Sequence, residues 1–468
     1  MARKLATVVG LCLIALTLSC AEDDTQEASG TAGKGKAELI VLNPGHYHAA
    51  LVQKTMYDQI DPNVHVYAPE GPELHEYLLR IEGFNNRTDD PTDWLELTYI
   101  GSDYLEMMVA EKPGNVVVLS GNNQKKTEYI RAAIDAGLNV YSDKPMCIDA
   151  NGFAVLEEAF AAAREKGLLL YDIMTERYNR LCILQKLLVC NPDVFGELQK
   201  GSPEEPAVVK ESVHHFFKYV SGKAVRRPTW YFDMVQQGEG IVDVTTHLID
   251  LVTWTCFPEQ VIDYHNDVEV VAARHEPTLI SRQQYEKVTG ATDFPAFLQD
   301  QLNDDGVLPC YSNGEIVYAM NGVHVKIAVA WKFQAPPETG DTHYSLVRGS
   351  RAHVIIRQGQ EQNYRPQLYV EPAPGADREQ VRVALEAAVA KFQDEYPGLS
   401  LQAYPQGWHV VFPAELLIGH EAHFRMVTEK YLDYLAEGRL PAWEVAFMTS
   451  KYFITTQALE IARRKSGN

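Results

Sequence analysis

Residues 38–48 read ELIVLNPGHYH, and this stretch decides the fold of the first half of the chain. Its first part, 38–43, is an almost wholly apolar run, which is the pattern of a strand buried on both faces. The segment 44–48 then turns the chain, and 49–59 has helical character. A strand, a turn and a helix in this order predict the opening unit of an α/β domain.

Strands and helices continue to alternate as far as residue 171. Short apolar runs predict strands at 64–68, 95–100, 115–120, 138–142 and 168–171, and helical patterns lie at 124–136 and 149–166. The alternation predicts a Rossmann-like, doubly wound parallel sheet with helices on both faces. Ligands bind such sheets beyond the carboxyl ends of the strands, where we expect the loops that begin at Pro44, Pro69, Gly121, Asp143 and Thr175.

The turn after the first strand departs from the glycine pattern of dinucleotide-binding proteins. That pattern is G-x-G-x-x-G, and the frame here is Asn43-x-Gly45-x-x-His48, so only the middle glycine is present. This glycine is the one that lets the backbone approach a pyrophosphate. Glu70, after the second strand, is the nearby candidate for a ribose hydroxyl, and a solvated loop acid is an equal alternative.

The second half of the chain has the pattern of an antiparallel sheet from about residue 207. Apolar and polar residues alternate over 323–332, and Asn321-Gly322 is a two-residue hairpin signal. A second hairpin is expected around Gly349-Ser350, and helices are expected at 377–392 and 419–436. We therefore predict a C-terminal α+β domain with an open, mostly antiparallel sheet, and a substrate cleft between the two domains.

Residues 240–250 read GIVDVTTHLID and carry an acid–base pattern. On a helix Asp243, His247 and Asp250 would line one face, because residues three and four apart are neighbours. A carboxylate beside an imidazole orients the ring and tunes its basicity, as a general base requires. An acidic helix start followed by a surface histidine is the competing interpretation.

Lys144-Pro145 after the fifth strand, followed much later by Asp243-x-x-x-His247, resembles the Gfo/Idh/MocA oxidoreductase family. Residues 142–145 lie where that family has Glu-Lys-Pro, and 240–250 match its G-G-x-x-x-D-x-x-x-H-x-x-D segment. The stretches 211–217 and 236–240 resemble a branch with its own oxidoreductase C-terminal domain, common in bacterial lipoproteins. The resemblance covers the mature chain in the order of its elements.

The resemblance implies an NAD(P)-dependent enzyme, with NAD favoured, that oxidises a ring secondary alcohol of a sugar or glycoside, C3 being a candidate position. It implies a catalytic cluster of Lys144, Asp243 and His247, in which His247 is the base, Asp243 holds its tautomer and Lys144 binds the reacting oxygen. The expected cofactor-binding residues are Asn43, Gly45, His46, Glu70, Asn122, Asn123, Lys144 and Arg177. Candidates for the sugar are Tyr178, His214, Trp230 and His423.

Other functions compete with simple oxidation. Transient oxidation by NAD would also serve a glycosidase or lyase, and a carbohydrate-binding protein without turnover would tolerate the altered glycine pattern. His420-x-x-His423 places two imidazoles on one helical face, but no third ligand is spaced to complete a zinc site. We therefore expect no metal, and a metal-dependent lyase or hydrolase remains the third alternative.

The N-terminus has the pattern of a bacterial export signal. Arg3-Lys4 precede an apolar run over 5–18 that ends at Cys20, which resembles a lipobox cysteine and is expected to carry a lipid anchor. We divide the chain into a signal peptide at 1–20, a flexible tether at 21–37, a Rossmann-like domain at 38–180 and a substrate-binding domain at 181–468. The expected location is extracytoplasmic, on the periplasmic face or surface of a Gram-negative cell.

Charge and cysteine content exclude several classes of protein. The formal net charge of −21 and the lack of a basic stripe argue against nucleic acid as a partner. The seven cysteines include no C-x-x-C pair, so neither a disulfide framework nor a cysteine zinc cluster is expected. The expected partners are a small carbohydrate and, through Cys20, the membrane. The family resemblance also implies a homo-oligomer formed through the C-terminal sheet.

Overall fold

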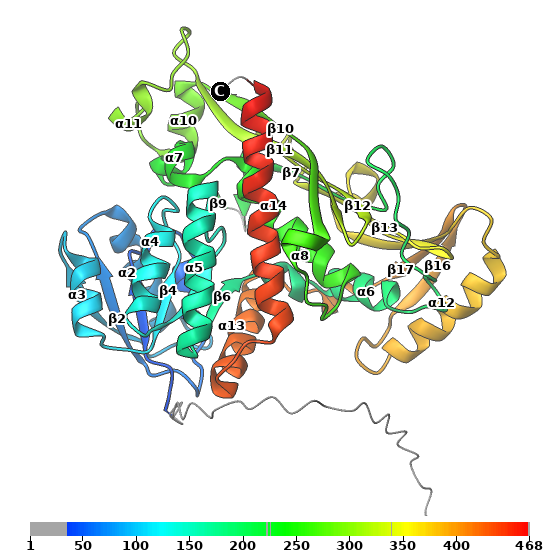
Figure 1. Ribbon diagram of the computed structural model, residues 1–468, viewed down its shortest axis with the longest axis horizontal. Helices are drawn as coiled ribbons and strands as arrows, with labels where there is room; N and C mark the ends of the chain where they lie inside the picture. The colour runs from blue at the N-terminus through cyan, green and yellow to red at the C-terminus, as the bar shows by residue number, and fades with distance from the viewer. Residues whose placement is uncertain (1–34, 221–222, 225, 338, 467–468) are drawn as a thin grey trace, which may run out of the picture. The chain divides into compact units, whose positions relative to one another are not determined.

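Six parallel strands form the sheet that the apolar runs predict (Figure 1). The computed structural model describes residues 35–220, 223–224, 226–337 and 339–466. The strand order β3-β2-β1-β4-β5-β6 is that of a dinucleotide-binding fold. The strands are β1 Leu39–Leu42, β2 Asn63–Ala68, β3 Leu95–Ile100, β4 Val116–Leu119, β5 Asn139–Asp143 and β6 Leu170–Ile173. The central β1 and β4 are buried at every position, whereas β3 at the edge is largely exposed.

The connections of this sheet are helical, with one departure from expectation. They are α1 His48–Leu51, α2 Pro72–Asn85, α3 Tyr104–Glu111, α4 Lys126–Asp135 and α5 Ala150–Lys166, followed by η1 Thr175–Tyr178 and α6 Arg180–Val189. The helix expected at 49–59 is wrong, because α1 is a single turn that ends at Leu51 and gives way to turns. The first loop of the sheet is therefore joined to a minimal helix.

The second sheet has nine strands in the order β10-β11-β12-β7-β13-β14-β15-β17-β16. Its strands are β7 Val208–Phe217, β10 Val268–Ile280, β11 Leu308–Met320, β12 Val323–Gln334, β13 Thr342–Arg348, β14 Ala352–Gln358, β15 Gln367–Pro372, β16 Ser400–Tyr404 and β17 Gly407–Val411. All neighbours are antiparallel except β12 and β7. The α/β class and the mostly antiparallel second sheet are confirmed.

Both predicted hairpins are present. The β11–β12 turn is Asn321-Gly322, and both residues have positive φ, +51° and +73°, which a two-residue turn of this type requires. The second turn joins β13 to β14, where Arg348 pairs with His353. A separate two-stranded ribbon pairs β8 Tyr219–Val220 with β9 Lys223–Ala224.

The remaining helices connect and cover the two sheets. They are η2 Thr229–Phe232, α7 Met234–Gln237, η3 Gly240–Val242, α8 Thr245–Cys256, α9 Tyr264–Asp267, α10 Arg282–Thr289, α11 Ala296–Gln299, η4 Gln360–Gln362, α12 Arg378–Phe392, η5 Ala414–Leu416, α13 His420–Glu437 and α14 Ala442–Ser466. The long α14 runs beside both α5 and α8 (Figure 1). It packs on β10 as well, so it joins the two halves of the chain.

Two hydrophobic cores underlie the two sheets. The core of the second sheet begins at Leu181 in sequence, close to the division predicted at 180. The core of the first sheet, however, includes Phe424, Val427 and Tyr431 of α13 and Tyr452 of α14. Residues from the C-terminal end of the chain therefore complete the first core, which the sequence division does not anticipate.

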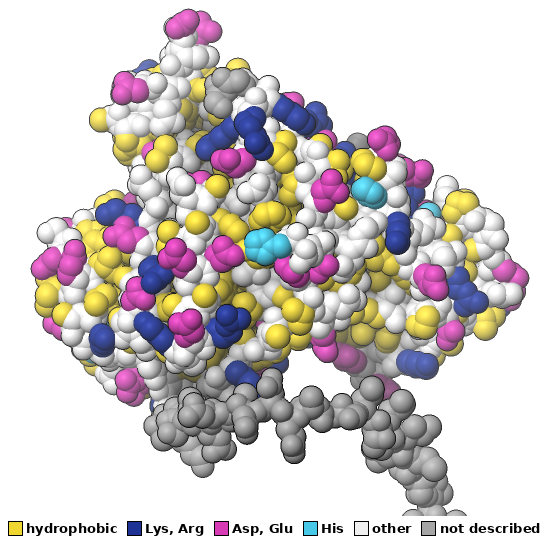
Figure 2. Space-filling view, in the orientation of Figure 1, with side chains coloured by type: hydrophobic (Ala, Val, Ile, Leu, Met, Phe, Trp, Pro, Cys, Tyr) yellow, Lys and Arg dark blue, Asp and Glu magenta, His cyan; other side chains and the backbone are white. Residues whose placement is uncertain are grey.

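The described surface mixes charges of both signs. On the face shown in Figure 2, acidic and basic side chains are interspersed, and the described residues form no continuous basic band there. Within the described residues, no helix has the length and apolar character needed to span a membrane. The predicted signal peptide, Cys20 and most of the tether lie outside the described residues.

Candidate active site

The loop after β1 packs tightly against the loop after β4. The amides of Gly45 and His46 both donate to the carbonyl oxygen of Ser120, at 3.0 and 3.2 Å. A Cβ on Gly45 would lie 3.3 Å from the Cα of Gly121 and 3.7 Å from the indole of Trp230. A side chain at position 45 would therefore be crowded by the backbone of Gly121, whereas Trp230 lies at ordinary contact distance.

Two histidines of this loop converge on one carboxylate at the end of β5. Asp143 Oδ2 lies 2.9 Å from His48 Nδ1 and 3.3 Å from His46 Nδ1, and it accepts a hydrogen bond from the Ser120 hydroxyl. Burial lowers the pKa of His48 to about 4, so its ring is neutral at pH 7. Although burial alone would raise it, the pKa of Asp143 is held well below its usual range by His48 and His46.

Lys144 and Asp243, two of the three predicted catalytic residues, meet at this edge of the sheet. Lys144 Nζ lies 2.5 Å from Asp243 Oδ1, and Gln237 Nε2 donates to the other oxygen of Asp243 at 3.1 Å. Burial opposes ionisation of Asp243, but the Lys144 charge prevails and lowers its pKa. Burial, followed by the nearby Lys144 charge, lowers the pKa of His247 well below its ordinary value. The site thus contains a neutral imidazole beside a lysine–aspartate pair.

The geometry of the acid–base segment differs from the helical pattern predicted for it. Helix α8 begins at Thr245, so Asp243 lies in the turn that precedes it and does not stack on His247 along a helical face. Both carboxylate oxygens of Asp243 accept hydrogen bonds, one from Lys144 and the other from Gln237. Among the described residues, His247 Nδ1 is buried and has no hydrogen-bond partner. Asp243 therefore positions Lys144, and the prediction that it holds the tautomer of His247 is wrong.

A glycine explains how this turn reaches its place. A Cβ on Gly240 would lie 1.7 Å from the carbonyl oxygen of Ser312 on β11, so no side chain fits. The next residue, Ile241, in turn packs against the face of Gly314 on the same strand. The contact with β11 fixes the position of the turn at 240–243, and this position places Asp243 within hydrogen-bond distance of Lys144.

Arg177 and Asp250 belong to a buried ionic network, defined here as Asp172, Arg177, Asp250, Glu444 and Lys451. Arg177 binds Asp250 through two bonds of 2.6 and 2.7 Å and Glu444 through two bonds of 2.8 and 3.0 Å. Lys451 bridges Asp172 at 2.8 Å and Asp250 at 3.2 Å. Because protein carboxylates occupy its guanidinium, Arg177 does not face a cofactor as predicted. The Asp250 carboxylate is likewise occupied, by Arg177 and Lys451.

Several of the other predicted cofactor residues make contacts inside the protein. Asn43 donates to the hydroxyl of Tyr129 at 3.1 Å. Asn122 and Asn123 donate to Gln236 and Gln237 of α7, so they hold the two halves of the chain together. Glu70 is 62% exposed in its side chain and pairs with the equally exposed His75, an arrangement that a ligand displaces at little cost.

The predicted substrate residues are dispersed around the site. Trp230 covers Gly45, and His214 packs against Trp331 with ring centroids 5.0 Å apart. His423 is buried, and neither ring nitrogen has a partner in the described part of the chain. Tyr178 is partly buried and packs against the first core. Trp230 therefore lies at the first loop, whereas no contact among the described residues links His214, Tyr178 or His423 to Lys144 or Asp243.

The sequence reasoning missed an aromatic and cationic group near His214. The Arg227 guanidinium lies 4.5 Å from the ring centre of Tyr231 and 5.0 Å from that of Trp331. It also donates to the carbonyl oxygens of Phe216 and His215. The doublet Arg226-Arg227 ahead of Trp230-Tyr231 could have indicated this group from the sequence. Trp331, which also packs against Arg227, could not be linked to it, because it lies about a hundred residues later on β12.

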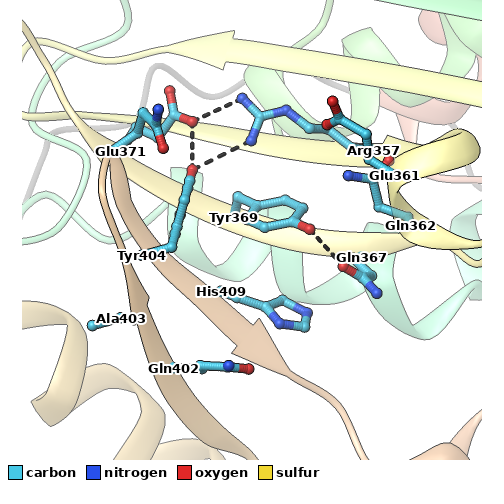
Figure 3. Close-up of a pocket in the computed structure, with 11 residues that line it drawn as sticks. Arg357, Glu361, Gln362, Gln367, Tyr369, Glu371, Gln402, Ala403, Tyr404 and His409 are labelled. Atoms are coloured by element: carbon cyan, nitrogen blue, oxygen red, sulfur yellow. Dashed lines mark hydrogen bonds and ion pairs between the residues drawn. The ribbon is translucent and has the colours of Figure 1, made fainter.

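A separate groove lies on the second sheet, among β14, β15, β16 and β17 (Figure 3). It has a volume of about 750 Å³ and is lined by polar and aromatic side chains, with Arg357 bonded to both Glu371 and Tyr404. Tyr369 and His409 stack within it, with ring centroids 5.0 Å apart. None of the predicted site residues lines this groove.

Comparisons with known proteins identify the family. The model described as "Putative oxidoreductase C terminal domain" matches residues 184–463. A crystal structure described as a "putative oxidoreductase" from Parabacteroides merdae is 52% identical, covers 93% of this chain and 99% of its own, and has a TM-score of 0.90. The chain therefore belongs to this family of oxidoreductases, which are of the Gfo/Idh/MocA type. A comparison with curated proteins finds no match.

More distant structures share the fold. Levoglucosan dehydrogenase in complex with NADH and levoglucosan is 14% identical, with 92% of this chain and 98% of that chain covered and a TM-score of 0.57. Biliverdin reductase from Synechocystis, in complex with biliverdin and NADP⁺, is 11% identical, with 91% and 99% covered and a TM-score of 0.54. At these identities the likeness establishes the fold alone.

Proposed function

We propose that this oxidoreductase uses a nicotinamide cofactor, NAD rather than NADP, to oxidise a ring secondary alcohol of a sugar or glycoside. The observation that carries the proposal is the Lys144–Asp243 pair beside the neutral His247, at the carboxyl edge of a parallel sheet with Rossmann strand order. This edge is where such sheets bind dinucleotides. The sugar bound by levoglucosan dehydrogenase and the NADH in the same structure support both parts of the proposal.

The backbone around Gly45 fits the anionic part of a dinucleotide. The amides of Tyr47 and His48 find no acceptor within the described part of the chain. Adjacent free amides at a turn form a concave site for phosphate oxygens. These two amides would hold the pyrophosphate, and Glu70 would meet the ribose at the end of β2. The bound nicotinamide would supply the hydride acceptor for the alcohol.

The catalytic roles follow from the protonation states. His247 Nδ1 is buried without a hydrogen-bond partner in the described part of the chain, and the pKa of the ring lies well below its ordinary value, so the neutral ring would accept a proton from the substrate hydroxyl at pH 7. The Lys144 ammonium donates hydrogen bonds and stabilises negative charge that develops on the same oxygen. Asp243 and Gln237 hold Lys144 in place through the pair described above.

Carbohydrate recognition would use aromatic faces near the loop. Tyr231 and Trp331 lie beside Arg227, and Trp230 lies beside Gly45; flat rings of this kind pack against the apolar faces of sugars. His214 stands against Trp331 and offers a polar atom beside the ring. The same residues would serve redox-assisted bond cleavage, in which transient oxidation acidifies the neighbouring C–H, and they would serve binding without turnover.

The proposal includes the location of the protein. The leader pattern supports a lipid anchor on Cys20 and an extracytoplasmic position on a Gram-negative cell. No free dinucleotide pool exists there, so a cofactor that stays bound through each turnover suits the site. Incorporation of labelled palmitate into the wild type and not into Cys20→Ala tests the anchor. A homo-oligomer through the nine-stranded sheet is part of the same proposal, and light scattering tests it.

The first experiment is to purify the mature chain without added cofactor, denature it and assay the supernatant for NAD(H) and NADP(H). Near-stoichiometric NAD(H) supports the proposal, and NADP(H) in its place would reverse the cofactor preference. A chain that releases no dinucleotide and binds none on titration would contradict the redox mechanism. In that case carbohydrate binding measured by calorimetry distinguishes a binding protein from an enzyme of another class.

A further inference from the structure

The histidine cluster beside the catalytic pair has the geometry of a metal site. One ligand atom each from His46, His48 and Asp143 lies within 4.8 Å of the other two. The two separations from Asp143 Oδ2 are 2.9 and 3.3 Å. Two ligands of a tetrahedral ion with bonds of about 2.1 Å lie about 3.4 Å apart. An ion therefore fits among these three side chains after shifts of a few tenths of an ångström.

Hydrogen bonding inside the protein does not account for the two imidazoles. His46 Nδ1 is buried and makes no hydrogen bond with any described residue, although Asp143 is close. His48 Nε2 is buried and likewise has no partner among the described residues. Buried polar atoms are nearly always paired, so two unpaired nitrogens in adjacent rings indicate a missing partner. His46 Nδ1 is therefore available to an ion, whereas at His48 Nδ1 the ion would replace the hydrogen bond to Asp143 Oδ2.

The carboxylate of this cluster is oriented as metal ligands usually are. The Lys144 amide donates to Asp143 Oδ1 at 3.0 Å, and the Ser120 hydroxyl donates to Oδ2 at 3.1 Å. The buried Lys126 ammonium donates to the main-chain carbonyl of Asp143 at 2.9 Å. Contacts of this kind fix the direction of a ligand before the ion arrives.

We propose that His46, His48 and Asp143 bind one divalent transition-metal ion of the zinc or iron(II) type. Two imidazoles and one carboxylate suit such ions, whereas magnesium and calcium require oxygen ligands. The cations of Lys126 and Lys144 oppose a bound ion, so its affinity must come from the nitrogen ligands, which again excludes magnesium and calcium. This assignment goes beyond the proposed oxidation and does not depend on a nicotinamide.

The site is open on one side. The side chain of His46 is 27% exposed, and the partly buried ring of His420 stacks on His48 with centroids 5.0 Å apart. Three protein ligands leave at least one position for water or for a substrate oxygen. Because Asp143 precedes Lys144, an ion held here would lie next to the catalytic pair.

The test is to load the untagged mature chain, previously stripped with chelator, with Zn²⁺ or Co²⁺ and to measure bound metal after dialysis. We expect about one ion per chain in the wild type, and visible d–d absorption with Co²⁺, because an open three-ligand site distorts the ion. His48→Gln and Asp143→Asn should each weaken binding by at least about tenfold. Metal uptake is measured both without and with NAD. Uptake without NAD tests the metal site by itself, so this result stands even if the nicotinamide proposal fails.

His75→Gln is the matched control, because that histidine is 60% exposed in its side chain and pairs with the exposed Glu70, outside the cluster. Circular dichroism establishes that each variant is folded. If both cluster variants fail to fold, the proposal is tested by two wild-type measurements alone, the cobalt absorption spectrum and the number of ions bound per chain. The proposal is overturned if the stripped wild type takes up much less than one ion per chain, or if His48→Gln binds as tightly as His75→Gln.

Discussion

The catalytic cluster and the buried ionic network lie close in the fold and have opposite character. In the network, Arg177 makes four bonds of 2.6 to 3.0 Å with Asp250 and Glu444, and Lys451 is fully buried between two carboxylates. In the catalytic cluster, by contrast, His247 keeps a buried nitrogen without a partner among the described residues. His46 and His48 do the same.

The difference shows how the same residue types serve stability or chemistry. A buried charged group whose hydrogen bonds are all made within the protein cannot also bind a ligand. Removing one of its partners leaves a buried charge without compensation. An incomplete cluster costs stability and retains capacity to bind or to move a proton. The sequence predicted that Arg177 binds the cofactor, but its guanidinium is fully paired with carboxylates, so Arg177 serves stability.

The largest expected effect concerns His247. His247→Asn should lower kcat for sugar oxidation by about 10²- to 10⁴-fold, because the variant lacks the general base. Its free energy of unfolding should change by less than about 1 kcal/mol, since Nδ1 of the ring makes no hydrogen bond with any residue that the structure describes. Initial rates of NADH formation with a panel of glycosides, and urea unfolding, measure the two quantities.

His265→Asn provides the control, because that side chain is 68% exposed and lies away from the site on α9. It should retain the wild-type rate. Wild-type kcat in His247→Asn would remove His247 from the mechanism and favour another base.

Lys451→Met should have the second largest effect, on stability. The substitution leaves the buried Asp172 carboxylate without its cation, whereas Asp250 keeps Arg177, and loss of one partner of such a pair costs about 3–5 kcal/mol. Urea unfolding followed by circular dichroism measures the change. The exposed ion pairs of Arg131 with Asp135 and Glu158 give the comparison, and Arg131→Met should cost about 1 kcal/mol or less. Equal losses in both variants would erase the distinction drawn between the two clusters.

The smallest expected effect is on pH dependence and concerns His423. Burial, then the neighbouring His420, lowers its pKa to about 4, whereas an unfolded histidine has a pKa of about 6.5. The unfolded chain binds the proton more readily between these values, so stability is lost as the pH falls from about 6.5 to 4. His423→Gln should reduce this loss by about 1 kcal/mol at pH 5, after allowance for solvent screening. Unfolding at pH 7 and pH 5 measures the slope, and an unchanged slope would show that His423 does not titrate in this way.

Local patterns predicted much of the architecture. The apolar runs at 38–43 and 115–120 are buried throughout as β1 and β4, because a strand covered on both faces needs no polar alternation. The Asn321-Gly322 turn was equally readable, since its backbone conformation is restricted to few residue types. The helix expected at 49–59 ends at Leu51, because Gln53 and Lys54 donate to carbonyl oxygens three residues back and the carbonyl of Gln53 accepts from the Trp94 indole.

The sequence by itself determined the parallel sheet, the hairpins and the resemblance that led to Lys144, Asp243 and His247. These features depend on spacing within short segments, which periodicity and turn chemistry encode. Only the tertiary structure decided that Asp243 holds Lys144, that Arg177 is saturated by Asp250 and Glu444, and that Asp143 meets two histidines of the first loop. Those partners lie far apart in sequence, and side-chain direction at a sheet edge depends on packing by elements such as β11 and α14.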